Sequence, residues 1–423
     1  NLSIGASYKI NDDFSLMVAQ ERGSLTSFSI KWQQNAIRQK EYQKPERGEG
    51  ESDYQYLEKI LALNAIGISE LQRSSDRVRI EFSQFEYFTF DQLESVINRA
   101  ISDSGFQEEV VKSFKIAGLN ADAEAGITGS SFSPSNRSFR DGPIFRNKTG
   151  VNIRPFLAGR EDFIKVAALL ENDTEIVFTE NLFFSGNLKL SLIDNFDDLT
   201  VPPVDTYPNQ VRSDIKKYLN NLGENISIGR AQLDYHITPY THNHVMFTAG
   251  ILEEMYAGYG MEYLWFNPDN NYAVGFEVFN AYKRGYKFNF ELQDYSNITG
   301  FANFYYRNYQ PFPFDLKISY GEYLAGDVGG TIELSRTFIN GARFGVFATF
   351  TDVTPDQFGE GTFDKGIFFR IPFGNNFFNY MWRPLTKDPG AKLIRKNTLY
   401  DLLVRFKPVN WFFGKKMCLF YTI

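Results

Sequence analysis

Residues 230–252 read RAQLDYHITPYTHNHVMFTAGIL, and this stretch decides the fold. Apolar side chains occupy every second position on both sides of a short turn: Ala231, Leu233, Tyr235 and Ile237 before it, and Val245, Phe247, Ala249 and Ile251 after it. Residues two apart lie on the same face of a strand, so one face of each strand meets an apolar medium and the other a polar one. The stretch therefore predicts an antiparallel hairpin with its turn at residues 240–243.

The same alternation returns throughout residues 150–373. We count roughly 12 segments of about ten residues or more, the length that a tilted strand needs to cross a bilayer. Short turns (240–243, 267–271, 308–313 and 339–342) alternate with long links (194–224, 283–294 and 354–364). Short turns on one side and long loops on the other are typical of outer-membrane barrels, with the short side periplasmic. A soluble all-β fold, its polar face in water, is the alternative.

Composition limits the class of protein. The 423 residues are 17% aromatic, with 42 Phe and 24 Tyr, which argues against disorder. No run of about 18 apolar residues occurs, so no transmembrane helix is expected. The net charge of −7 argues against nucleic-acid binding, and the single Cys418 excludes an internal disulfide and a cysteine metal cluster. The aromatic side chains must therefore pack in the core of a soluble protein or form the lipid-facing surface of a membrane protein.

Changes of period divide the chain into five parts. Residues 1–32 alternate like strands; because three strands cannot close a sheet, we interpret them as the end of a first barrel, or else as a meander packed on the next domain. Residues 33–52 form a polar linker. Residues 53–148 predict an α+β domain, in the order helix, strand, strand, helix, strand, followed by a loop. Residues 149–375 form the second barrel, and 376–423 a C-terminal segment.

Residue types that often form catalytic or metal sites in proteins give only weak evidence for such a site in this sequence. His242 and His244 flank a turn residue without an evident third metal ligand, so a solvated turn is the better interpretation. His236 lies on the polar face, but no G-x-S-x-G marks a nucleophile for it. Glu253 and Glu254 are adjacent and would point to opposite faces of a strand. The Gly-rich pieces lack the following helix of a phosphate loop. We therefore expect no catalytic site, no metal and no cofactor.

The second half resembles the YjbH/GfcD family of outer-membrane proteins from exopolysaccharide and group 4 capsule operons. The blocks that carry the resemblance occur in the family's order: 211–215 (VRSDI), 254–258 (EMYAG), 293–295 (QDY), 323–327 (YLAGD), 350–353 (FTDV), 358–366 (FGEGTFDKG) and 383–388 (RPLTKD). They span residues 211–393. Before residue 150, only the organisation matches.

The resemblance implies a mainly β protein: a transmembrane antiparallel barrel of about 12 strands with a small periplasmic α+β domain. Family members resemble two tandem barrels, which fits the strands at 1–32. The implied location is the bacterial outer membrane. The implied partners are outer-membrane lipids, a polysaccharide, an outer-membrane polysaccharide exporter and small periplasmic proteins of the same operon. The resemblance also implies a lipoprotein; a truncated start would explain why no lipidated Cys precedes Asn1.

The blocks have two interpretations. In the first they are structural, because their glycines suit bulges and sharp turns near strand ends. In the second, polar residues of the blocks line a path for an anionic or hydroxyl-rich glycan: Asp327, Glu360, Asp364, Lys365, Arg383 and Asp388. Glu277, Phe279 and Phe347 fall on the inward face of their strands and extend this path. Residues 383–393 follow the last clear strand and either enter the barrel or form a periplasmic docking element.

Three functions remain open. We expect a non-enzymatic outer-membrane component of exopolysaccharide or capsule export, which guides or passes a polymer or anchors the periplasmic export complex. The first alternative is a generic porin or structural barrel without glycan specificity. The second is a barrel hydrolase that acts on lipid or glycan through His236 or Glu277.

Overall fold

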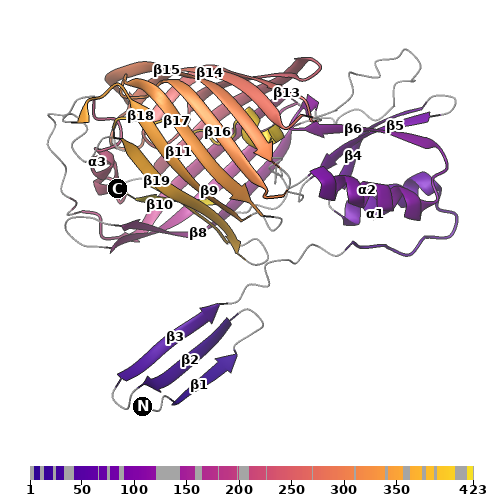
Figure 1. Cartoon of the computed structure of the whole chain (residues 1–423), viewed down its shortest axis with the longest axis horizontal. Coiled ribbons are helices and arrows are strands. Elements are labelled where there is room, and N and C mark those ends of the chain that lie inside the picture. The colour runs from indigo at the N-terminus through magenta and orange to yellow at the C-terminus, as the bar shows by residue number, and fades with distance from the viewer. Residues whose placement is uncertain are drawn as a thin grey trace.

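The structure is a computed structural model of the chain. It describes residues 4–9, 14–21, 25–32, 42–64, 66–73, 77–84, 90–120, 143–157, 164–179, 181–197, 199, 209–224, 226–268, 270–308, 311–338, 342–355, 363–373, 378–384, 388–404 and 417–422. The chain is mainly β. It folds into a three-stranded sheet, a small α+β unit and one large curved sheet (Figure 1).

The N-terminal strands β1 (Ile4–Lys9), β2 (Phe14–Glu21) and β3 (Leu25–Trp32) pair antiparallel in that order. They form a sheet of their own, separate from the large one. The expected strands at 1–32 are therefore present. Whether they end a preceding barrel stays a prediction.

The α+β unit has the expected order of elements. It consists of α1 (Asp53–Leu63), β4 (Ile66–Arg73), β5 (Arg77–Gln84), α2 (Phe90–Ser104), β6 (Glu109–Ile116) and β7 (Leu119–Asn120). Helix α1 begins at Ser52, whose side chain accepts the Gln55 N–H while Gln55 bonds back to the Ser52 N–H. The buried side chains of α1 face those of β5 and β6 and form the core of the unit.

The second half of the expected linker packs against this unit. Tyr42 donates a hydrogen bond to Asp103 over 2.8 Å, and the Lys44 ammonium lies 2.9 Å from the same carboxylate. These two donors hold the pKa of the Asp103 carboxyl below its usual range. Residues 42–52 are thus attached to the unit, because an aromatic ring and a cation meet the end of α2.

The large sheet runs from β8 to β20 with every neighbouring pair antiparallel. Its strands are β8 (Ile144–Leu157), β9 (Ile164–Val177), β10 (Leu182–Asp194), β11 (Ser227–Tyr240), β12 (Asn243–Ile251), β13 (Tyr256–Phe266), β14 (Tyr272–Arg284), β15 (Leu292–Asn308), β16 (Phe314–Glu322), β17 (Val328–Thr337), β18 (Arg343–Thr351), β19 (Asp364–Phe373) and β20 (Phe378–Pro384).

The two ends of this order meet only through one further strand. Strand β21 (Met417–Thr422) pairs parallel with β20 along its length and with β8 at Thr422 and Leu157. The expected barrel boundaries, 149 and 375, therefore differ from the sheet at both ends. Strand β8 starts before residue 149 and strand β20 lies beyond residue 375. Part of the segment 376–423 therefore belongs to the sheet.

The two faces of the large sheet differ in chemistry. Side chains on the outer face are apolar and exposed, for example Ile318, Ile332 and Val346 on three adjacent strands. Side chains on the inner face of the same strands are polar and buried, for example Ser319 and Glu333. The alternation read from the sequence thus separates an apolar exterior from a polar interior.

The two ends of the curved sheet are also different. At the end with the short turns lies the α+β unit: Ala117 accepts a hydrogen bond at the His236 ring over 2.9 Å, and the Asn120 N–H donates to the Thr238 hydroxyl over 3.1 Å. Helix α3 (Ile215–Asn220) lies at the opposite end (Figure 1). None of the helices that the structure describes has the length and apolarity to span a membrane.

Candidate functional site: a C-terminal segment inside the large sheet

Residues 388–404, here called the interior segment, run through the space that the large sheet encloses. The segment is irregular from 391 to 398 and ends in the π-helix η1 (Tyr400–Val404). It contacts α3 at its start, the inner faces of β9, β13 and β14 in its middle, and the apolar core of the α+β unit at its end. It therefore connects the two ends of the sheet.

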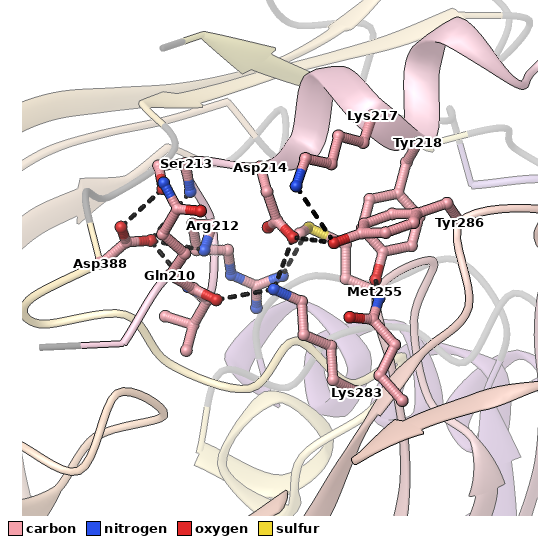
Figure 2. Close-up of polar contacts among 12 residues, drawn as sticks. Gln210, Arg212, Ser213, Asp214, Lys217, Tyr218, Met255, Lys283, Tyr286 and Asp388 are labelled. Atoms are coloured by element: carbon pink, nitrogen blue, oxygen red, sulfur yellow. Dashed lines mark hydrogen bonds and ion pairs between the residues drawn. The ribbon is translucent and has the colours of Figure 1, made fainter. Parts of the chain in front are cut away.

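At the α3 end, a single carboxylate holds the start of the interior segment (Figure 2). Asp388 Oδ1 accepts the backbone N–H groups of Val211, Arg212 and Ser213 over 2.8, 2.7 and 2.9 Å. Its Oδ2 accepts the Ser213 hydroxyl over 2.6 Å. Asp388 is only 5% exposed. Hydrogen bonds to a buried charged acceptor are among the stronger ones, so this residue fixes the loop before α3 to the interior segment.

A buried ion pair lies beside this contact. The Arg212 guanidinium forms two parallel hydrogen bonds with Glu253, of 2.8 and 2.7 Å, and donates a third to the Lys392 carbonyl over 2.7 Å. Glu253 also accepts the Ile394 N–H over 3.3 Å. The pair thus joins the loop before α3, the turn before β13 and the interior segment.

The neighbouring ion pair belongs to the same layer. Lys283 Nζ lies 2.6 Å from Asp214 Oδ2 and also donates to the Gln210 carbonyl over 2.6 Å (Figure 2). The Tyr218 hydroxyl donates to the Arg284 carbonyl over 2.6 Å. Burial raises the pKa of the Tyr218 hydroxyl. These contacts seat α3 on the end of β14.

The turn between β16 and β17 holds the interior segment by its backbone. Asp327 accepts the Gly390 N–H over 2.8 Å, and the Leu324 N–H donates to the Ala391 carbonyl over 2.9 Å. Gly390 has φ of +79°, and a Cβ there would lie 2.8 Å from the Thr349 methyl group. Burial raises the pKa of the Asp327 carboxyl to about 6, although the Gly390 N–H acts in the opposite direction.

In the middle of the segment, two basic side chains contact acidic residues on the inner face of the sheet. Arg395 Nη1 lies 2.8 Å from Glu262, its Nη2 bonds to Glu277, and its guanidinium lies 4.2 Å from the centre of the Phe279 ring. Lys396 bonds to Glu175 and donates to the Ser185 hydroxyl over 3.1 Å. Arg395 is 3% exposed at its side chain, so both of its carboxylate partners depend on it for charge compensation.

The last turn of the segment joins the sheet to the α+β unit. Tyr400 stacks on Tyr305 with 3.9 Å between ring centres and an angle of 12°. The Leu399 N–H donates to Glu262 over 3.0 Å. Leu399, Tyr400, Leu402 and Leu403 share one apolar core with the buried residues of α1, β5 and α2. The α+β unit and the interior segment are thus packed together.

Comparison with known proteins identifies the family. The model of the family described as "YjbH: Exopolysaccharide biosynthesis protein YbjH" matches residues 108–405. The chain belongs to the YjbH family. This YjbH family member is 31% identical over 279 residues to "Uncharacterized lipoprotein YjbH" of Escherichia coli (strain K12). That alignment covers 61% of this chain and 39% of the relative, so the matched part spans about two fifths of the relative's length.

Among solved structures, one similar chain is "OmpT (in-vitro folded), an outer membrane protein of Vibrio cholerae". It has 9% sequence identity and a TM-score of 0.21, with coverage of 54% of this chain and 79% of that one.

The structure brings four of the residues singled out in the sequence of this YjbH family member onto one feature. Asp388 belongs to the interior segment, Asp327 and Glu277 bond to it, and Phe279 lies under its arginine. Phe347 is buried on the inner face of β18. The first interpretation of the blocks, as structural devices, describes the contacts of the two aspartates. Whether a glycan meets any of these residues stays a prediction.

The other singled-out residues do not join this group. Asp364 is half-buried at the start of β19. Lys365 is exposed and lies 4.4 Å from the centre of the Phe363 ring. It alternates with Asp364, and so shares the outer face with Ile367. Glu360 and the side chain of Arg383 lie outside the described residues.

Sequence reasoning missed the charged residues that complete the site: Arg212, Asp214, Glu262, Lys283, Arg395 and Lys396. Arg212 and Asp214 stand inside a block of the YjbH resemblance, which was a usable signal. Glu253 was considered only as half of a catalytic pair with Glu254, which also begins the block 254–258. They take separate partners instead, because Glu254 bonds to Arg154 and Lys189 of β8 and β10. Within the described ranges, no group of His, Cys, Asp and Glu is arranged to hold a metal ion.

Proposed function

We propose that the chain is a non-enzymatic outer-membrane component of exopolysaccharide or capsule export, with the large sheet as a membrane-spanning barrel and the α+β unit in the periplasm. One observation carries the proposal: long antiparallel strands expose apolar side chains outward and bury polar ones inward. Such a surface is costly in water and favourable in lipid, where every backbone polar group must pair within the sheet. The family description supplies the link to exopolysaccharide.

The interior segment bears on how such a component would act. A generic open porin requires a water-filled lumen, whereas here the segment lies across the lumen and contacts three strands. This favours a closed or gated barrel that guides the polymer or anchors the periplasmic export complex. The α+β unit shares its core with the segment, which makes it the natural docking site for an exporter or small periplasmic proteins of the operon.

A barrel hydrolase has less support. The His236 ring is buried, bonds to the Ala117 carbonyl, and lies 4.9 Å from the Phe183 ring centre. Glu277 is bound to Arg395. Both candidate residues are thus engaged in contacts that hold the ends and the middle of the barrel together.

A strain that lacks the gene tests the proposed function. We expect the polymer to accumulate inside the cell envelope while its extracellular amount falls by at least about tenfold, because export rather than synthesis is blocked. Polymer would be measured by sugar composition in culture medium and in the periplasmic fraction. Loss of polymer from both fractions would point to synthesis, and an unchanged extracellular amount would overturn the proposal. Complementation with the gene is the control.

A further inference from the structure

The interior segment and the wall around it have opposite charge. The segment carries Lys392, Arg395 and Lys396 within five positions. The strands facing its middle carry Glu175, Glu262 and Glu277, each of which bonds to one of the last two cations. The inner face of the sheet around the middle of the segment is therefore complementary in charge to an extended basic chain.

Within the part of the chain that the structure describes, a further carboxylate of the wall accepts hydrogen bonds from neutral side chains. Asp234 is 1% exposed on β11 and accepts hydrogen bonds from Gln232 over 2.8 Å and from Thr248 over 2.7 Å. Gln232 is fully buried, and its Oε1 lies within the interior without a hydrogen-bond partner. The wall thus retains unused acceptor capacity beside the cations of the segment, which a ligand carrying donors would satisfy.

Among the described residues, Lys317 is a basic side chain on the inner face of a strand near these carboxylates. Lys317 on β16 lies 5.4 Å from the Tyr305 ring centre and 5.8 Å from the Tyr400 ring centre, beside the last turn of the interior segment. Against it stand four carboxylates: Glu175, Asp234, Glu262 and Glu277. Without Arg395 and Lys396, this region of the lumen would be clearly negative. Rings of acidic side chains select for cations in membrane pores.

The contacts in the middle of the interior segment are of a kind that allows the segment to leave the lumen. In its middle, the contacts are ion pairs and hydrogen bonds to side chains of a polar wall rather than a strand ladder. Water can take over such bonds in a wet lumen, whereas it cannot replace the pairing of the sheet. The apolar core at η1 couples this departure to movement of the α+β unit.

We propose that the interior segment is a displaceable gate, and that the path it opens selects cations and therefore admits an uncharged or cationic glycan rather than an anionic one. This rests on the proposed function. It also revises the anionic alternative that the sequence left open, because an anionic polymer would be repelled where Arg395 and Lys396 now lie.

Conductance of the full chain in planar lipid bilayers tests this proposal. We expect little current from the wild type. R395E/K396E places new carboxylates against Glu262, Glu277 and Glu175 and should open the path, with potassium preferred over chloride by roughly fivefold or more. R395Q/K396Q should open it more weakly with the same preference. R336Q, which changes an exposed arginine at the Phe338 ring, is the matched control and should behave as the wild type.

Three oligosaccharide probes identify the ligand class. In the opened variant, chitosan and dextran oligomers should reduce the potassium current, and oligogalacturonate should not. Adding E262Q/E277Q to R395Q/K396Q should abolish the potassium preference. Chloride preference, absence of preference, or block by oligogalacturonate would overturn the proposal, as would equal conductance of the wild type and both opened variants. If charge reversal prevents folding, the R395Q/K396Q variant decides alone.

The two proposals can fail separately. If the opened variant is potassium-selective but the deletion strain secretes normally, the gate proposal is supported and the export function is contradicted. If secretion is blocked but the opened variant is chloride-selective, the export function is supported and the gate proposal is contradicted.

Discussion

Replacing Arg395 with methionine should release the interior segment from the wall. The substitution keeps most of the aliphatic volume but leaves Glu262 and Glu277, which are partners in register on β13 and β14, without the guanidinium that pairs with both. Removing one partner of a buried pair costs about 3–5 kcal/mol. Because each 1.4 kcal/mol is tenfold in an equilibrium constant, the Leu399 N–H, which bonds to Glu262, should exchange with solvent at least about a hundredfold faster.

Two further variants separate charge from packing. R395M/E262Q/E277Q removes the uncompensated charges and should recover most of the protection. R336M, at an exposed arginine of β17, should exchange as the wild type. Unchanged exchange of the Leu399 N–H in R395M would contradict the assigned role of the buried ion pairs. Exchange would be followed by mass spectrometry on the full chain in detergent.

Replacing Asp388 with alanine should detach the loop before α3 from the interior segment. The carboxylate accepts three backbone N–H groups and one hydroxyl, and hydrogen bonds to a charged group contribute about 1.5–3 kcal/mol each. Even with partial replacement by water, we expect a loss of about 3 kcal/mol or more. The readout is exchange of the backbone N–H groups of residues 211–213, together with protease cleavage in that loop.

The conservative variant D388N tests whether charge matters. Its amide oxygen can still accept from some of these donors, so its effect should lie between the wild type and D388A. Residues 399–403, at the far end of the segment, should keep their protection in both variants because their contacts are with β13, β15 and the α+β unit. Equal protection of residues 211–213 in D388A and wild type would contradict the role of this carboxylate.

Alternation was sufficient to predict the large sheet. Strands such as β11 and β12 carry their period of two over residues 231–237 and 245–249, and there each side chain faces the side that its parity assigns. The period changes at the start of β11, where the register shifts, and at Ile251, which is buried. The N-terminal strands and the helices of the α+β unit were predicted for the same reason, since periodicity is a local property. The last strand was not, because β21 pairs in parallel with β20 and with β8, and so depends on segments that are distant in the sequence.

The candidate site was predictable only in part. Asp327 and Asp388 were found through the resemblance, yet their shared role depends on a backbone N–H of Gly390 and on a loop more than 170 positions away. Arg395 stands in an irregular stretch with no period to assign it a face. Its partners Glu262 and Glu277 lie on adjacent strands in register, which only the fold brings together. The aromatic excess likewise divides between outer rings, such as Phe276, and inner rings, such as Tyr305.

We propose that the outer face of the large sheet lies in lipid. The most direct test of this proposal places a nitroxide label singly at Ile318→Cys, Ile332→Cys and Val346→Cys, in a Cys418→Ser background reconstituted in bilayers. Ala62→Cys, exposed on α1, is the reference. We predict that oxygen relaxes the three sheet labels more than a water-soluble nickel chelate does, with the opposite order at Ala62. Labels on the sheet that meet the nickel chelate as readily as the label at Ala62 would contradict the account.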